Sequence, residues 1–123
     1  MLKLSPIENI DTTVTNLFNR MDLLIFKEKN IHFVYAPALD ISGYGNSKKE
    51  AENSFLITLK AFLEFTNEKN TLEDELLKFG WKAENGNIFS PPYFDELLNK
   101  NPYLAEIVRE KDFQKRNLTL QTF

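Results

Sequence analysis

The segment at residues 36–51 constrains the fold more than any other part of the chain. It reads APALDISGYGNSKKEA, an extended apolar run that meets Gly43 and Gly45 and then enters a long amphipathic pattern. Ser47 and Glu50 have the three-residue spacing of a capping box, in which the two side chains satisfy free N–H groups at the start of a helix. The segment therefore predicts a strand that turns directly into a helix.

The pattern after this corner predicts a helix over residues 47–67 that covers a sheet. Apolar side chains recur there at intervals of three and four, and charged side chains lie mostly on the opposite side. A second helix is predicted from Thr71 to just before Gly80, with three carboxylates in its first turn, where the helix dipole favours them. Two more helices are predicted over residues 93–99 and 101–111, because a capping residue and proline precede each of them.

Residues 22–41 indicate two strands in an antiparallel hairpin with a tight turn at residues 28–30. The second strand is predicted to continue toward Ile41. Pro37 would then occupy an edge position or a bulge, because proline cannot donate a ladder hydrogen bond.

Three shorter patterns complete the predicted elements. Asn85-Gly86 indicates the two-residue turn of a short hairpin. The alternating tail after Lys111 indicates a final strand. Near the start of the chain the sequence favours a short helix, on the helical spacing of Val14, Leu17, Phe18 and Met21.

These elements predict a single α+β domain over residues 1–123. A chain of 123 residues fills one hydrophobic core, and no flexible linker divides it. The sequence has no cysteine, which excludes disulfides and thiolate chemistry and fits a reducing compartment. It has no secretory pattern and no run near the roughly 20 apolar residues of a membrane span. A cytoplasmic protein with no membrane partner is expected.

No recognisable motif points to catalysis, a cofactor or a metal. The only histidine, His32, lies inside a predicted strand, where a sheet residue facing solvent or an adjoining element is the better interpretation. Glu73, Asp74 and Glu75 are explained by their place in the first turn of a helix. We therefore predict no catalytic, cofactor-binding or metal-binding residues, no cofactor, and a protein that is not an enzyme.

The charge distribution favours a protein partner over nucleic acid. The net charge is −3, and residues 83–99 carry three acidic groups and no basic one. Phosphate binding needs clustered lysine and arginine, which this chain does not supply over an extended face. Phe33 and Tyr35 alternate as base-stacking residues on a sheet would, and the basic tail contains Lys111, Lys115 and Arg116, so RNA binding stays open as the alternative.

The corner at residues 36–51 resembles the HicB-like antitoxin domain. That family has a strand ending in a Pro-Leu-x-x-Gly corner, followed by a Ser or Thr that opens a helix with Glu-Ala in its first turn. The resemblance covers about residues 22–70, which we take as a HicB-like core, with residues 71–123 as a C-terminal helical and strand elaboration. The matching residues are Pro37, Leu39, Gly43, Gly45, Ser47, Glu50 and Ala51.

This resemblance implies a fold and a function. The fold would be a small antiparallel sheet with a long helix packed on one face, a reduced RNase H-like arrangement without its catalytic carboxylates, here with extra C-terminal helices and a terminal strand. The function would be that of a non-enzymatic, antitoxin-like interaction module that forms a homo-oligomer and neutralises a small basic RNA-cleaving toxin.

Two other functions stay open beside this one. The alternative is an RNA- or nucleic-acid-binding protein of a stand-alone HicB-like type. A degenerate RNase H-like hydrolase is the third hypothesis, and it requires at least three acidic side chains to converge on the sheet. Residues 81–123 show no clear DNA-binding appendage, so repression of an operon is not predicted.

Overall fold

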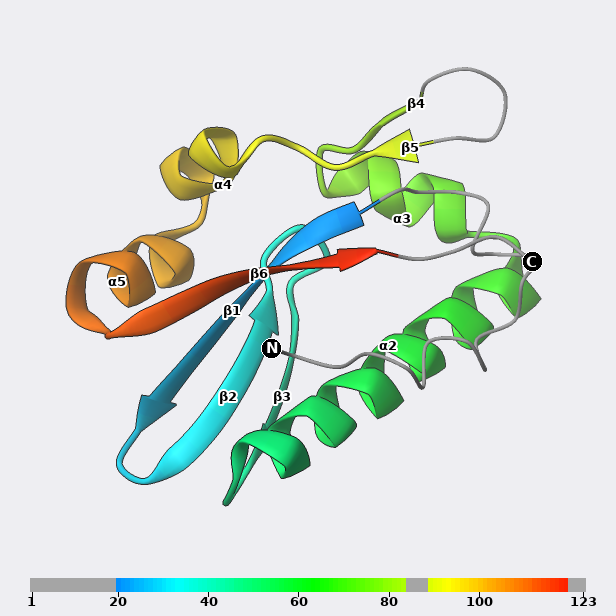
Figure 1. Cartoon of the computed structure of the whole chain (residues 1–123). Helices are drawn as coiled ribbons and strands as arrows, with labels where there is room; N and C mark the ends of the chain where they lie inside the picture. Colours follow the sequence, from blue (N-terminus) through cyan, green and yellow to red (C-terminus); the bar gives the residue numbers. More distant parts are fainter. Residues whose placement is uncertain (1–19, 84–88, 120–123) are drawn as a thin grey trace.

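The computed structural model describes residues 20–83 and 89–119 of the chain (Figure 1). Within these ranges the fold is α+β, as the sequence predicts. The short helix predicted near residues 14–21 lies outside the described residues except for Met21, which belongs to a strand instead. The predicted Asn85-Gly86 turn also lies outside them.

A four-stranded antiparallel sheet forms the centre of the fold, in the order β3-β2-β1-β6. The predicted hairpin is confirmed, and Lys29 and Asn30 make its turn with φ values of 50° and 67°. Such left-handed turns match the twist of the flanking strands. The predicted last strand is also confirmed. The strands are β1 (Arg20–Glu28), β2 (Ile31–Ala36), β3 (Ile41–Gly45) and β6 (Phe113–Thr119).

The prediction that the second strand continues toward Ile41 is wrong. β2 ends at Ala36, whose carbonyl oxygen accepts a 3.2 Å hydrogen bond from the N–H of Leu39. The chain turns there, Asp40 adopts a φ of 54°, and β3 begins at Ile41. The turn at residues 37–40 contains buried Ala38 and Leu39, which explains why its sequence reads like a strand.

The helix α2 (Lys48–Lys69) packs on β3 and β2, which confirms the predicted long helix. Its start follows the predicted cap: Ser47 Oγ accepts from the N–H of Glu50 at 3.1 Å, and Glu50 Oε1 accepts from the N–H of Asn46 at 3.0 Å. A Cβ at Gly43 would lie 2.1 Å from the backbone nitrogen of Phe55. The glycine thus permits the close approach of strand and helix, and it lies within β3 rather than in a loop.

The chain after α2 forms α3 (Leu72–Lys78), as predicted, and then a two-stranded ribbon of β4 (Lys82–Ala83) and β5 (Phe89–Ser90). Gly80 adopts a φ of 90°, which suits a glycine at the end of a helix. Trp81 is buried and its Nε1–H donates to the carbonyl oxygen of Ala38 at 2.7 Å. This bond ties the β2–β3 turn to the segment after α3.

The sheet carries helices on both faces (Figure 1). The two predicted C-terminal helices are confirmed as α4 (Phe94–Lys100) and α5 (Pro102–Glu110), and they lie on the face opposite α2, a position that the sequence did not predict. Successive side chains of β1 point to opposite faces of the sheet, so the core consists of two apolar clusters. Leu23 belongs to the cluster beside α2, the α2 cluster, and Leu24 to the cluster beside α5, the α5 cluster. Both leucines are fully buried, so β1 is shared by two apolar clusters.

Candidate functional site

The outer side of α2 carries an exposed apolar stripe. Ile57, Ala61 and Phe65 follow one another at intervals of four residues, which places them on one side of the helix. Ile57 is 71% exposed and Phe65 is 60% exposed. A surface helix ordinarily presents polar residues on its solvent side, so a contiguous apolar stripe there points to a contact with another molecule.

The neighbouring helix α3 adds exposed apolar and acidic side chains. It follows α2 closely, because the N–H of Thr71 donates to the carbonyl oxygen of Thr66 at 2.9 Å. Leu77 is 54% exposed, and Glu73 and Asp74 are exposed in the first turn. We define the α2–α3 surface by its exposed apolar and acidic residues, which are Ile57, Ala61, Glu64, Phe65, Glu68, Glu73, Asp74 and Leu77.

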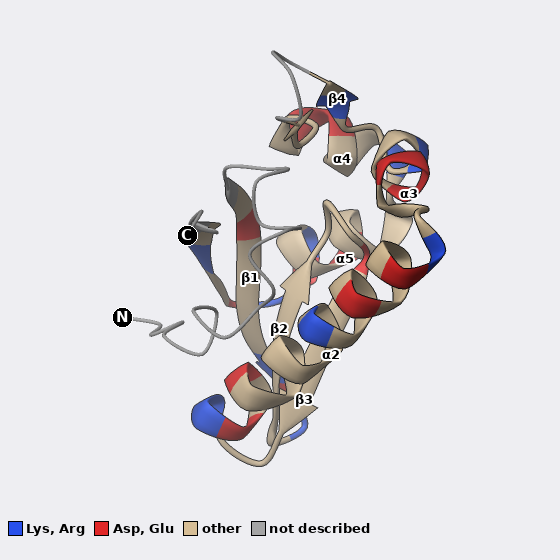
Figure 2. Cartoon of the chain, turned by 90° about the vertical axis from the view of Figure 1, so that its right-hand side faces the viewer, with Lys and Arg blue, Asp and Glu red and all other residues tan. Residues whose placement is uncertain are grey.

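The α2–α3 surface is acidic. Residues 61–78 contain five acidic and two basic residues, a net charge of −3, which equals the net charge of the whole chain. Lys78 is already paired with Glu75 at 3.3 Å. Figure 2 shows the acidic bands on α3 and on the adjoining part of α2. A field of one sign attracts a partner of the opposite sign, here a basic one.

Sequence reasoning missed this surface. The sequence pattern accounts for the carboxylates of α3 through the helix dipole, and it identifies α2 by its buried side. The available signal was that Ile57 and Phe65 fall outside the buried stripe, which contains Ala51, Phe55, Leu59 and Leu63.

The acidic segment at residues 83–99 is a weaker candidate for a partner surface. Glu84 lies outside the described residues. Asp95 and Glu96 occupy the first turn of α4, and Glu96 Oε1 accepts from the N–H of Tyr93 at 3.3 Å. Their charge is therefore explained by helix capping.

The two aromatic residues considered for base stacking differ in their surroundings. Tyr35 is buried, 2% exposed, with the ring of Tyr103 edge-on to it at 5.1 Å. Phe33 is half-buried, and it stacks on Phe26 at 5.1 Å and meets Tyr44 at 6.2 Å. Tyr44 is 66% exposed, so Phe33 and Tyr44, rather than Phe33 and Tyr35, form the accessible aromatic pair.

The basic residues of the tail are engaged within the molecule. Lys111 pairs with Glu28 at 3.2 Å, and Lys115 pairs with Asp22 at 3.6 Å. The ammonium group of Lys115 also lies 4.1 Å from the ring centre of Phe94. These contacts leave Lys111 and Lys115 less available to a phosphate backbone.

A hydrolytic metal site finds no support in the part of the chain that the structure describes. No group of three or more His, Asp, Glu or Cys side chains able to hold a metal ion occurs there. His32 lies in β2 beside Lys27 of β1, on the α2 side of the sheet. Glu73, Asp74 and Glu75 stay at the start of α3 and do not converge with carboxylates of the sheet.

Comparison of the chain with protein-family models, with curated proteins and with solved structures found no match. Among the described helices, none is long and apolar enough to cross a membrane.

Proposed function

We propose that this chain is a non-enzymatic interaction module of the HicB-like antitoxin type, which uses its α2–α3 surface to cover a small basic RNA-cleaving toxin. The proposal rests on the exposed Ile57 and Phe65 beside a segment of net charge −3. Apolar side chains that protrude from a charged surface match the usual anatomy of a protein interface, a few anchors within a polar rim.

Charge and apolar contact contribute differently to such a complex. The carboxylates Glu64, Glu68 and Asp74 would speed the encounter with a basic partner, because long-range attraction acts mainly on the association rate. Phe65 and Leu77 would then hold the complex by removing apolar area from water. The association rate should accordingly fall with added salt, whereas loss of an apolar anchor should mainly speed dissociation.

The proposal predicts a short basic protein encoded beside this chain, and the test is whether the chain neutralises it. Co-expression of the two is expected to restore growth and to yield a stable complex. Phe65→Asp combined with Leu77→Asp is expected to abolish both effects, because it places two more charges at the apolar anchors. The control is Tyr44→Asp, which introduces one such charge at an exposed aromatic residue of β3 and is compared with each single variant, Phe65→Asp and Leu77→Asp.

Two results would overturn the proposal. One is the absence of a short basic reading frame beside this chain together with no small basic protein in the native complex. The other is full neutralisation by the Phe65→Asp/Leu77→Asp variant. Light scattering on the free chain tests the expected homo-oligomer in the same samples.

RNA binding is the second candidate function, and the accessible Phe33–Tyr44 pair favours it. Charge disfavours it, because Lys111 and Lys115 of the basic tail are already paired with Glu28 and Asp22. A salt-dependent gel shift that is lost in Lys115→Glu/Arg116→Glu would support RNA binding, and no shift at low salt would exclude it.

A further inference from the structure

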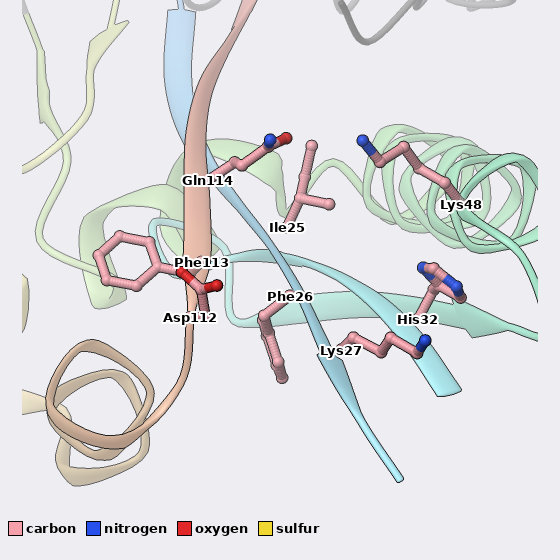
Figure 3. A pocket seen from close by; sticks show the side chains of 8 residues that line it. All are labelled: Ile25, Phe26, Lys27, His32, Lys48, Asp112, Phe113 and Gln114. Carbon is pink, nitrogen blue, oxygen red and sulfur yellow. The ribbon is translucent and has the colours of Figure 1, made fainter. Parts of the chain in front are cut away.

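A hollow of about 240 Å³ lies between the β1, β2 and β6 strands and the start of α2 (Figure 3). It lies at the opposite end of α2 from Phe65, about 25 Å away at the rise of an α-helix. The hollow is thus separate from the α2–α3 surface. It is lined by Ile25, Phe26, Lys27, His32, Lys48, Asp112, Phe113 and Gln114.

Strand register brings the polar residues of the hollow together. Lys27 is the cross-strand partner of His32, and Ile25 is the partner of Gln114. Because side chains alternate along a strand, all four share the side of the sheet on which Ile25 packs toward α2. Lys48 is the first residue of α2, and its side chain extends toward the same space (Figure 3).

Lys27 and Lys48 take part in none of the ion pairs found in the described part of the chain. The four ion pairs found there involve other cations, namely Lys78, Arg109, Lys111 and Lys115. Glu52 lies one turn beyond Lys48; burial raises its pKa, while the nearby positive charges of Lys48 and Lys49 act in the opposite direction. Two lysine side chains therefore line one hollow without an ion pair of their own, Lys27 beside His32 and Lys48 toward Ile25 and Gln114 (Figure 3).

We propose that this hollow binds a phosphate group through the ammonium groups of Lys27 and Lys48, with the His32 imidazole and the Gln114 amide as further donors. Lysine is a common phosphate ligand that acts as a point charge, so it tolerates the varied approach angles of an open hollow. Ile25, 6% exposed, contributes an apolar side chain to the lining of the hollow.

The size of the hollow restricts the ligand. Sites for drug-sized molecules are usually about 300–1,000 Å³, so about 240 Å³ suits free phosphate or a small phosphate monoester rather than a dinucleotide. Asp112 stands apart from both lysines, across the hollow (Figure 3). Its carboxylate would accept a hydrogen bond from a hydroxyl group of such a monoester.

The test is an NMR titration of the full chain with inorganic phosphate and, separately, with ribose 5-phosphate, against sodium chloride at matched ionic strength. Phosphate is expected to shift the amide resonances of Lys27, His32 and Lys48. Lys27→Gln and Lys48→Gln should each weaken binding about tenfold, or about 1.4 kcal/mol. Lys60→Gln is the matched control, because Lys60 is exposed on α2 away from the hollow.

The outcomes decide whether the hollow binds phosphate and whether the ligand is free phosphate or a phosphate monoester. Absence of any shift beyond that caused by chloride overturns it, as does equal weakening in Lys60→Gln and Lys48→Gln. Tighter binding of ribose 5-phosphate that Asp112→Asn reduces supports a phosphate monoester as the ligand. Equal binding of the two probes supports free phosphate.

Discussion

At the scale of single residues, Tyr35 links three parts of the chain through one hydroxyl group. The hydroxyl donates to Asp40 Oδ1 at 2.6 Å and accepts from Asn101 Nδ2 at 2.8 Å. Asn101 also caps α5, since its Oδ1 accepts from the N–H of Leu104 at 3.0 Å. The β2–β3 turn is thereby joined to the start of α5. Burial, followed by the hydrogen bond to Asp40, raises the pKa of Tyr35 well above its ordinary value.

Tyr35→Phe is expected to lower the free energy of unfolding by about 1–3 kcal/mol at neutral pH, because Asp40 and Asn101 lose a buried partner. In the wild type, the raised pKa of folded Tyr35 means that the unfolded chain loses its phenolic proton first. Stability should therefore fall as the pH rises above the ordinary tyrosine value of 10.0. This alkaline fall should be shallower in the variant.

Urea unfolding at neutral pH and at about pH 11 measures both effects. Tyr44→Phe is the control for removal of a tyrosine hydroxyl, because Tyr44 is exposed and the change should leave the midpoint at neutral pH nearly unchanged. An alkaline fall of equal steepness in the wild type and Tyr35→Phe would contradict the assignment.

At the scale of elements, the two helices α2 and α3 have different N-termini. Ser47 accepts the N–H of Glu50, whereas Thr71 makes no side-chain capping bond at the start of α3. We expect Ser47→Ala to cost about 1 kcal/mol of unfolding free energy, because it leaves that N–H without its protein acceptor. Thr71→Ala should cost much less. Equal losses in chemical denaturation would show that the observed cap does not stabilise α2.

The elements that the sequence predicted are those whose signals are local. The Ser47–Glu50 spacing, Gly80 and Asn101-Pro102 each act within one or two turns, and the corresponding helix ends agree with the structure. The turn at residues 37–40 was missed because it is held by distant groups. The carbonyl oxygen of Ala38 accepts a hydrogen bond from Trp81. Asp40 accepts a hydrogen bond from Tyr35, whose hydroxyl group in turn accepts one from Asn101.

The two candidate sites could not be predicted from the sequence, because they also depend on how distant parts of the chain meet. The hollow collects residues from two neighbouring strands, a strand near the other end of the chain and a helix start, and sequence spacing does not report such a meeting. The exposure of Ile57 and Phe65 depends on which side of α2 the sheet occupies. Helical periodicity predicts which positions of the helix are apolar, but it does not predict which exposed apolar residues contact another molecule.

At the scale of the whole molecule, β1 joins the two apolar clusters. Leu23 and Leu24 are each 0% exposed and point to opposite faces of the sheet. We expect Leu23→Ala and Leu24→Ala each to cost about 2–5 kcal/mol, as is usual for buried leucine. Because one strand serves both clusters, each variant should still unfold in a single transition.

Trp81 fluorescence, which reports on the α2 cluster, and far-UV circular dichroism, which reports on all helices, measure this directly. The two unfolding curves should coincide in the wild type and in both variants. Leu77→Ala, at a half-exposed position, should leave the midpoint nearly unchanged. Separate transitions for the two probes would show that the clusters unfold independently.

The pairing of β1 with β6 sets an order of events during protein synthesis. Met21 and Phe26 of β1 can form their strand pairs only after Leu118 and Phe113 of β6 have been synthesised. β6 is the last of the described elements to leave the ribosome. Until then β2 covers only one edge of β1, and the N–H and C=O groups of the other edge are free to pair with a neighbouring nascent chain. The arrival of β6 therefore ends a period in which crowded polysomes or slow translation would favour misassembly over folding.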